Sequence, residues 1–291
     1  MSDNRSGMNR RGFLKAGGTA LAATLVAQAA KAAKAAPGGG FAGQSLQVWS
    51  CGGLAEAFMP ANAMYEQQSG STISYTGAFA GALGKSLLGG NAQTEVFAPR
   101  VLDLAKKLKA QGKMLSFQPL CYTRYVLVTP KGNPAKITSI QDLKRSDVKT
   151  LCSPDSSPPG GQAAMGVLKK SGVLEQAKAQ SIYLGSCVQH DVADVASGKA
   201  HAAVVELRVT RLPRYKDAFE IIDIPEEFFP APPIPFTIGV MKWAKDQEYA
   251  RNFVEFITSD AGQAHFEAAG FVPARSEEGE RLTHKYGVVD V

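Results

Sequence analysis

The chain opens its first α/β unit with Leu46-Gln47-Val48-Trp49-Ser50-Cys51-Gly52-Gly53-Leu54-Ala55-Glu56-Ala57-Phe58. The apolar run before Cys51 is typical of a buried strand, and the apolar residues after Gly53 recur at helical spacing. This pattern predicts a strand, a tight turn and a helix. Such a turn presents free N–H groups and the positive end of a helix dipole, so it often binds a small charged ligand or lowers the pKa of a thiol. An ordinary strand-to-helix connection is the alternative.

The same alternation of strand and helix continues along the chain. We expect further strands at 73–75, 95–98, 122–129, 150–153, 182–184, 202–205, 219–224 and 236–241, and helices at 54–68, 101–111, 162–170, 189–197, 246–257 and 260–269. This order predicts an α/β protein with doubly wound, mainly parallel sheets flanked by helices. Long strands near 121–129 and 234–241 are candidate hinge crossings between two lobes. We therefore expect lobe 1 at 45–121 plus 232–291 and lobe 2 at 122–231.

Most of the excess positive charge lies at the N-terminus. The formal net charge is +6, yet residues 1–35 hold six basic residues against the single acid Asp3. The nearly neutral remainder gives no electrostatic argument for binding nucleic acid. Asn9-Arg10-Arg11-Gly12-Phe13-Leu14-Lys15 precedes an Ala-rich run that is short for a membrane span, and small-x-small cleavage candidates follow it. The segment resembles a twin-arginine signal that departs from the pattern at Asn9, so we expect a signal peptide at 1–35, a linker at 36–44 and export to the periplasm.

Five stretches occur in a fixed order along the chain, at 46–58, 94–98, 125–130, 195–205 and 253–273. Together they resemble the periplasmic solute-binding proteins of ABC uptake systems, and most closely the class II, molybdate-binding branch. The resemblance implies two lobes that close on one ligand like a venus flytrap, without catalysis or a required cofactor. It also implies as partners a small inorganic ligand and an ABC transporter permease or a sensor kinase at the inner membrane. We expect the protein to be a monomer.

In that family the ligand is held by turns at the strand ends of both lobes. The resemblance places these turns at Cys51, Gly52 and Gly53, at Phe79, Ala80 and Gly81, at the segment from Cys152 to Gly161 with Gly160, at Cys187 and Val188, and at Glu206. The chemistry departs from the family pattern, because three cysteines and a carboxylate stand where serine hydroxyls and backbone N–H groups grip a tetrahedral oxyanion.

The cysteines support more than one interpretation. If Cys51, Cys152 and Cys187 meet on closure, they suit a thiophilic ion such as copper(I), zinc or arsenite. Glu206 and His190 are candidate further ligands, although Glu206 could instead be a solvated strand end or pair with Arg208, and His190 could be a solvated helix residue. Four cysteines in an oxidising compartment also allow disulfides, but a bridge between the lobes would lock them together. Cys121 is expected to be a buried apolar residue.

Three functions follow from these residues. The first is a periplasmic receptor for a soft metal or metalloid ion held by cysteines. The alternative is a receptor for an oxyanion of the molybdate, tungstate or sulfate type, held by N–H groups. The third is an enzyme with a cysteine nucleophile. No Cys-His-Asn set with recognisable local motifs is visible in the sequence, so we expect no enzymatic activity.

Overall fold

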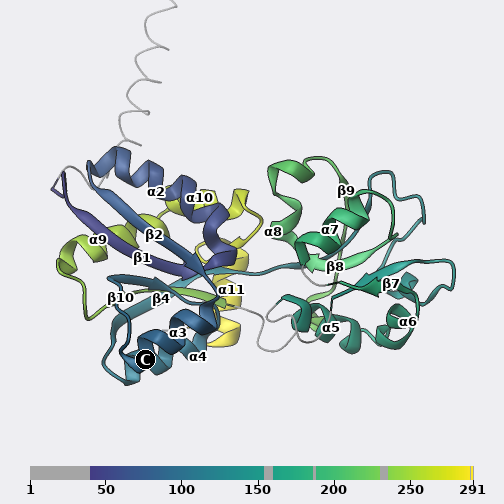
Figure 1. Ribbon diagram of the computed structural model, residues 1–291, viewed down its shortest axis with the longest axis horizontal. Helices are drawn as coiled ribbons and strands as arrows, with labels where there is room; N and C mark the ends of the chain where they lie inside the picture. The colour runs from purple at the N-terminus through teal and green to yellow at the C-terminus, as the bar shows by residue number, and fades with distance from the viewer. Residues whose placement is uncertain (1–39, 154–159, 186–187, 230–234, 289, 291) are drawn as a thin grey trace, which may run out of the picture.

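The computed structural model describes residues 40–291 except 154–159, 186–187, 230–234, 289 and 291. The expected signal peptide and most of the expected linker therefore lie outside the described residues. Two α/β lobes stand side by side, as predicted (Figure 1). Among the described helices, none is both long and apolar enough to cross a bilayer.

The first lobe is built on a six-stranded sheet with the order β11-β4-β10-β3-β1-β2. Strand β1 runs parallel to both of its neighbours, whereas β10 is antiparallel to β3 and β4. The sheet is thus mixed rather than mainly parallel, because the chain leaves this lobe through β4 and returns to it through β10. Its strands are β1 (Ser45–Cys51), β2 (Thr72–Ala78), β3 (Val96–Ala98), β4 (Met114–Tyr122), β10 (Pro235–Met241) and β11 (Val272–Pro273).

The second lobe contains two smaller sheets. In the order β8-β5-β9 both pairings are antiparallel, whereas β6 and β7 are parallel. The single strand predicted at 122–129 is interrupted at Thr123 and Arg124, where the chain passes from β4 into the second lobe. The strands are β5 (Tyr125–Pro130), β6 (Thr150–Cys152), β7 (Ser181–Leu184), β8 (Ala203–Glu206) and β9 (Phe219–Asp223).

Helices flank the sheets of both lobes (Figure 1). In the first lobe they are α2 (Ala55–Ser69), α3 (Ala80–Gly89), α4 (Leu102–Ala110), α9 (Gln247–Thr258), α10 (Asp260–Ala268) and α11 (Glu277–Tyr286). In the second lobe they are α5 (Gly160–Lys170), α6 (Leu174–Ala179), α7 (Val188–Ala196) and α8 (Leu207–Thr210). Short 3-10 turns complete the chain: η1 (Gly52–Leu54), η2 (Ile140–Lys144), η3 (Pro213–Tyr215) and η4 (Glu226–Phe228).

The apolar pattern of the first α/β unit is explained by burial. Leu46 and Val48 on β1, and Leu54 and Phe58 at the start of the helical segment, are all fully buried. Burying an apolar side chain of this size contributes roughly 1.5–3 kcal/mol. This packing fixes the end of β1, and therefore the Cys-Gly-Gly turn, at the edge of the core.

Candidate functional site

The turns after β1 and β2 lie next to each other, as predicted. Parallel pairing sets Cys51 opposite Ala78, so the chain leaves both strands at the same edge of the sheet. Neither η1 nor α3 has a side chain that caps its N-terminus. The first N–H groups of a helix have no partner within the helix. This edge therefore offers hydrogen-bond donors to a ligand.

Glu206 reaches this region from the second lobe. It ends β8, its side chain is 2% exposed, and each of its oxygens meets one guanidinium group. Arg100 Nη2 lies 2.5 Å from Oε1 and Arg208 Nε lies 2.6 Å from Oε2. Burial raises the pKa of Glu206, but Arg100 and Arg208 outweigh burial and lower it to about 2. The ion pair with Arg208, one of the interpretations of Glu206 from the sequence, is confirmed. The interpretation of Glu206 as a solvated strand end is wrong, because its side chain is buried.

Arg100 comes from the first lobe, directly after β3. Its backbone forms a bridge with Phe236, and its guanidinium lies 5.5 Å from the centre of the Phe236 ring. Nη2 also donates to Tyr125 Oη at 3.3 Å. The next residue, Val101, has φ of 72°. Such a value is a genuine outlier for a β-branched residue, and it costs on the order of 1–3 kcal/mol. The loop therefore holds Arg100 in the interlobe site at some cost to stability.

Arg208 lies against the glycine turn of the first lobe. A Cβ added to Gly53 would be 3.2 Å from Arg208 Cζ and 3.3 Å from Nε and Nη2. Gly53 thus leaves room for the guanidinium. Arg208 also pairs loosely with Glu56, with 3.9 Å between Nη1 and Oε1. It lines a cavity of about 200 Å³ between α2, α10 and the segment 208–213. That volume is several times the roughly 30 Å³ a water molecule occupies in the liquid.

The described thiols are not activated. Cys51, Cys121 and Cys152 are buried and free, and burial raises the pKa of each. The expectation that the Cys-Gly-Gly turn could lower a thiol pKa is therefore wrong for Cys51: a hydrogen bond from the Gly53 N–H lowers its pKa, but burial has the larger effect. The prediction that Cys121 is buried is confirmed.

The set of metal ligands predicted from the sequence is not assembled by the described residues. Within them, no group of three or more His, Cys, Asp or Glu side chains could hold a metal ion. The charges that shift the pKa of Cys51 are those of Arg100, Glu206 and Arg208. The charges that shift the pKa of Cys152 are those of Lys178 and Asp191, so the two thiols lie in different surroundings. Cys187 lies outside the described residues. Gly160, Val188 and His190 belong to described helices, but their side chains are not described. The cysteine set remains a prediction.

The turn before α3 presents an aromatic side chain. Phe79 is 55% exposed, whereas the following Ala80 is buried. A Cβ on Gly81 would lie 2.9 Å from Phe79 Cε1, so the glycine allows the ring to lie close over the first turn of the helix. Phe79 is therefore available at the interlobe edge.

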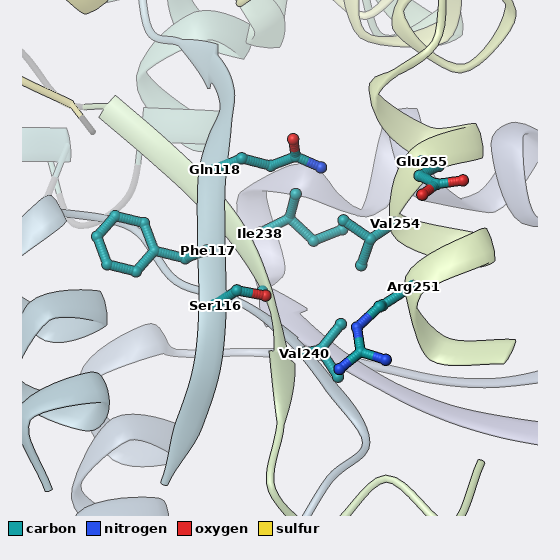
Figure 2. Close-up of a pocket in the computed structure, with 9 residues that line it drawn as sticks. Ser116, Phe117, Gln118, Ile238, Val240, Arg251, Val254 and Glu255 are labelled. Carbon is teal, nitrogen blue, oxygen red and sulfur yellow. The ribbon is translucent and has the colours of Figure 1, made fainter. Parts of the chain in front are cut away.

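A second cavity lies within the first lobe, between β4, β10 and α9. Figure 2 shows Gln118, Ile238 and Val254 facing the space between β4, β10 and α9, with Phe117 on the other side of its strand. Its volume is about 230 Å³, and its lining comes entirely from the first lobe. Because it does not involve the second lobe, it is not the candidate interlobe site.

Comparisons with known proteins agree with this architecture. Residues 46–272 match the model of the bacterial extracellular solute-binding protein family. A putative ABC transporter substrate-binding lipoprotein, YvgL of Bacillus subtilis, is 29% identical over 193 residues, 66% of this chain and 72% of that protein. The molybdate-binding protein ModA of Mycobacterium bovis is 25% identical over 265 residues, 86% of this chain and 94% of that protein.

A solved structure shows the same fold. The substrate-binding domain of a putative molybdenum ABC transporter from Clostridium difficile superposes with a TM-score of 0.69 at 22% identity, covering 79% of this chain and 98% of that domain. Fold and interlobe site thus define a two-lobed solute-binding protein. The chain belongs to the family of bacterial extracellular solute-binding proteins, and the resemblance seen in the sequence is confirmed.

Arg100 was not among the site residues predicted from the sequence. Its only local signal is its place after the buried strand that ends at Ala98, since ligands of open α/β sheets bind beyond the carboxyl ends of strands.

Proposed function

We propose that this protein is the receptor of an ABC-type uptake system and binds a small tetrahedral oxyanion of the molybdate, tungstate or sulfate type between its lobes. The N–H groups at Gly52 and the start of α3 would face the anion from the first lobe. Arg208 would face it from the second.

The observation that carries this proposal is the excess of buried positive charge at the glycine turn. Arg100 and Arg208 share the single buried carboxylate of Glu206, which leaves a formal charge of +1 on these three side chains. Guanidinium groups and helix N-termini are both suited to oxyanions. The curated relative ModA of Mycobacterium bovis is named a molybdate-binding protein, which favours the oxyanion over a cysteine-held soft ion.

The cellular setting follows from the same proposal. A twin-arginine signal at 1–35 would export the folded protein to the periplasm. An ABC permease in the inner membrane would then accept the anion from the closed receptor, and a sensor kinase is the alternative partner.

The proposal is tested by thermal unfolding of the protein purified from periplasm, with molybdate, tungstate, sulfate, zinc and arsenite as separate additions. At one hundred times its Kd a ligand stabilises the folded state by about 2.7 kcal/mol, so we expect one oxyanion to raise Tm by roughly 5–10 °C. The matched control is Arg208→Gln, in which this shift should shrink. A shift with zinc or arsenite alone, abolished by Cys51→Ser, would overturn the proposal and restore the cysteine hypothesis.

A further inference from the structure

At the interlobe site two buried positive side chains meet one buried negative side chain. The exposed fractions of the Arg100, Glu206 and Arg208 side chains are 4%, 2% and 16%. Cys51, beside them, keeps its proton because burial raises its pKa, so it adds no charge. Glu56 is farther from Arg208, with 3.9 Å between Oε1 and Nη1, than Glu206 is at 2.6 Å, so it cancels less of the guanidinium charge. One carboxylate therefore determines whether the site carries a charge of +1 or +2.

Glu206 also sets the direction in which Arg208 donates. Its Oε2 accepts a hydrogen bond from Nε of Arg208, and this bond fixes one edge of the planar guanidinium group. In the part of the chain that the structure describes, no residue accepts a hydrogen bond from Nη2. That nitrogen lies beside Gly53, where an added Cβ would be 3.3 Å away. The free N–H groups of Arg208 are thus held at the turn that offers backbone donors.

Building on the proposed function, we propose that Glu206 sets the charge preference of the anion site. It holds Arg208 on the ligand and cancels one of the two positive charges that Arg100 and Arg208 bring. Arg208 is the residue that contacts the anion, and Glu206 is a positioning residue that acts through it. The ligand class is a small tetrahedral oxyanion whose binding depends on its charge as well as on its shape.

Two pairs of anions separate charge from shape. Molybdate and perrhenate are both tetrahedral, but molybdate carries two negative charges and perrhenate one; sulfate and perchlorate form a second such pair. Binding of all four is measured by calorimetry for the wild-type chain and for Glu206→Gln. Removing one buried negative charge favours the dianion more than the monoanion. We expect the ratio of molybdate affinity to perrhenate affinity to rise on the order of tenfold in Glu206→Gln.

A second variant and a control make the test robust. Arg208→Gln keeps the Arg100–Glu206 pair, so its fold does not depend on an unpaired buried carboxylate. This variant should bind all four anions more weakly and should have a lower ratio of molybdate affinity to perrhenate affinity. Asp223→Asn removes the same unit of charge from the surface, where Asp223 is 74% exposed and paired with Arg124. Its ratio should equal that of the wild type. Circular dichroism confirms that each variant is folded.

The outcomes distinguish this inference from the proposed function. If the wild type binds an oxyanion but the ratio is unchanged in the folded variants, Glu206 does not set the charge preference, and the receptor function stands. If Glu206→Gln fails to fold, the double variant Glu206→Gln/Arg208→Gln is compared with Arg208→Gln: a higher ratio of molybdate to perrhenate affinity in the double variant supports the inference, and an equal ratio overturns it. If no oxyanion binds the wild-type chain, the proposed function and this inference both fail.

Discussion

Two clusters of charged side chains join the lobes, and they differ mainly in exposure. The first is Arg100, Glu206 and Arg208, which are almost fully buried at the interlobe site. The second is centred on Glu226 of η4, which follows β9 of the second lobe and meets α11 of the first. Each is built around one glutamate that accepts several hydrogen bonds.

The Glu226 cluster is open to solvent. Glu226 accepts from Arg281 Nη2 at 2.6 Å, Lys285 Nζ at 3.0 Å and Tyr286 Oη at 2.7 Å, and the two cationic side chains are 46% and 49% exposed. Burial raises the pKa of Glu226, but these hydrogen bonds outweigh it and lower the pKa to about 2. Helix α11 lies beyond residue 272, where the family match ends.

Glutamates with similar pKa shifts need not lose the same amount of stability when a partner is removed. In the buried cluster each charge has lost its water and depends on its partners, so breaking one pair is costly. In the exposed cluster water replaces a lost partner. The buried cluster can therefore tune a ligand site, whereas the exposed cluster only fastens α11 to the second lobe.

Arg100→Met should produce the largest loss of stability. Glu206 would stay buried with only Arg208 to balance its charge, and we expect the free energy of unfolding to fall by about 3 kcal/mol. Urea unfolding of the variant and of Arg124→Met measures this difference. Arg124 pairs with Asp223 at the surface, so its loss should cost less than about 0.5 kcal/mol. Equal effects of the two substitutions would contradict the distinction between the clusters.

Acid should weaken both clusters over one pH range. The pKa of Glu206 and of Glu226 is about 2 in the folded chain and near the ordinary value of 4.5 when unfolded. A depressed pKa means that the unfolded chain binds protons first, so this stability is present above about pH 4.5 and is lost as pH falls toward 2. Urea unfolding at pH 7, 4 and 3 measures the loss. Because the two pKa shifts are similar, each carboxylate should supply a similar share of this pH dependence, so we expect Glu226→Gln to lose roughly half as much stability as the wild type between pH 7 and pH 3. A nearly flat profile in that variant would mean that Glu226 alone carries the pH dependence, and an unchanged profile would mean that Glu206 does.

The sequence predicts the first α/β unit well because its pattern is local. Leu46 to Phe58 has the alternation and helical spacing that burial requires, and the Glu206–Arg208 pair is two residues apart. Arg100 could not be paired with Glu206 in this way, since the fold alone brings these distant residues together. Strand β4 was missed except at its end because it contains the polar residues Ser116 and Gln118 as well as Pro119.

Strand direction and the last helix also escape local patterns. A run of apolar residues is the same whether its neighbour is parallel or antiparallel, so the mixed sheet follows only from the path of the chain between lobes. Helix α11, Glu277–Tyr286, has only Gly279 and Leu282 buried and is otherwise mostly polar, so it offers few apolar residues from which a helix could be predicted. The turns after β1 and β2 occur where the sequence predicts them, whereas the guanidinium group of Arg100 beside Glu206 was not expected.

Glu226→Gln tests the exposed cluster directly. The amide keeps the shape of the side chain but loses the charge that Arg281 and Lys285 share, and we expect a loss of about 1 kcal/mol at low salt. In 1 M NaCl this loss should nearly vanish, because the Debye length falls to about 3 Å. The effect of Arg100→Met should persist in the same salt, since its charges are buried. Salt dependence that is equal in the two variants would show that exposure does not separate the clusters.

The smallest expected effect has the opposite sign and concerns the backbone that carries Arg100. Val101 has φ of 72° and is 42% exposed, so glycine would relieve strain while removing little buried surface. Strain relief of about 1–3 kcal/mol is partly offset by roughly 0.5–1 kcal/mol of added chain entropy in the unfolded state. Val101→Gly should therefore raise the free energy of unfolding by about 0.5–1 kcal/mol in urea. If the strained loop also holds Arg100 on Glu206, the more stable variant should bind its oxyanion with altered affinity. Unchanged stability together with unchanged affinity would show that the loop does not constrain the buried cluster.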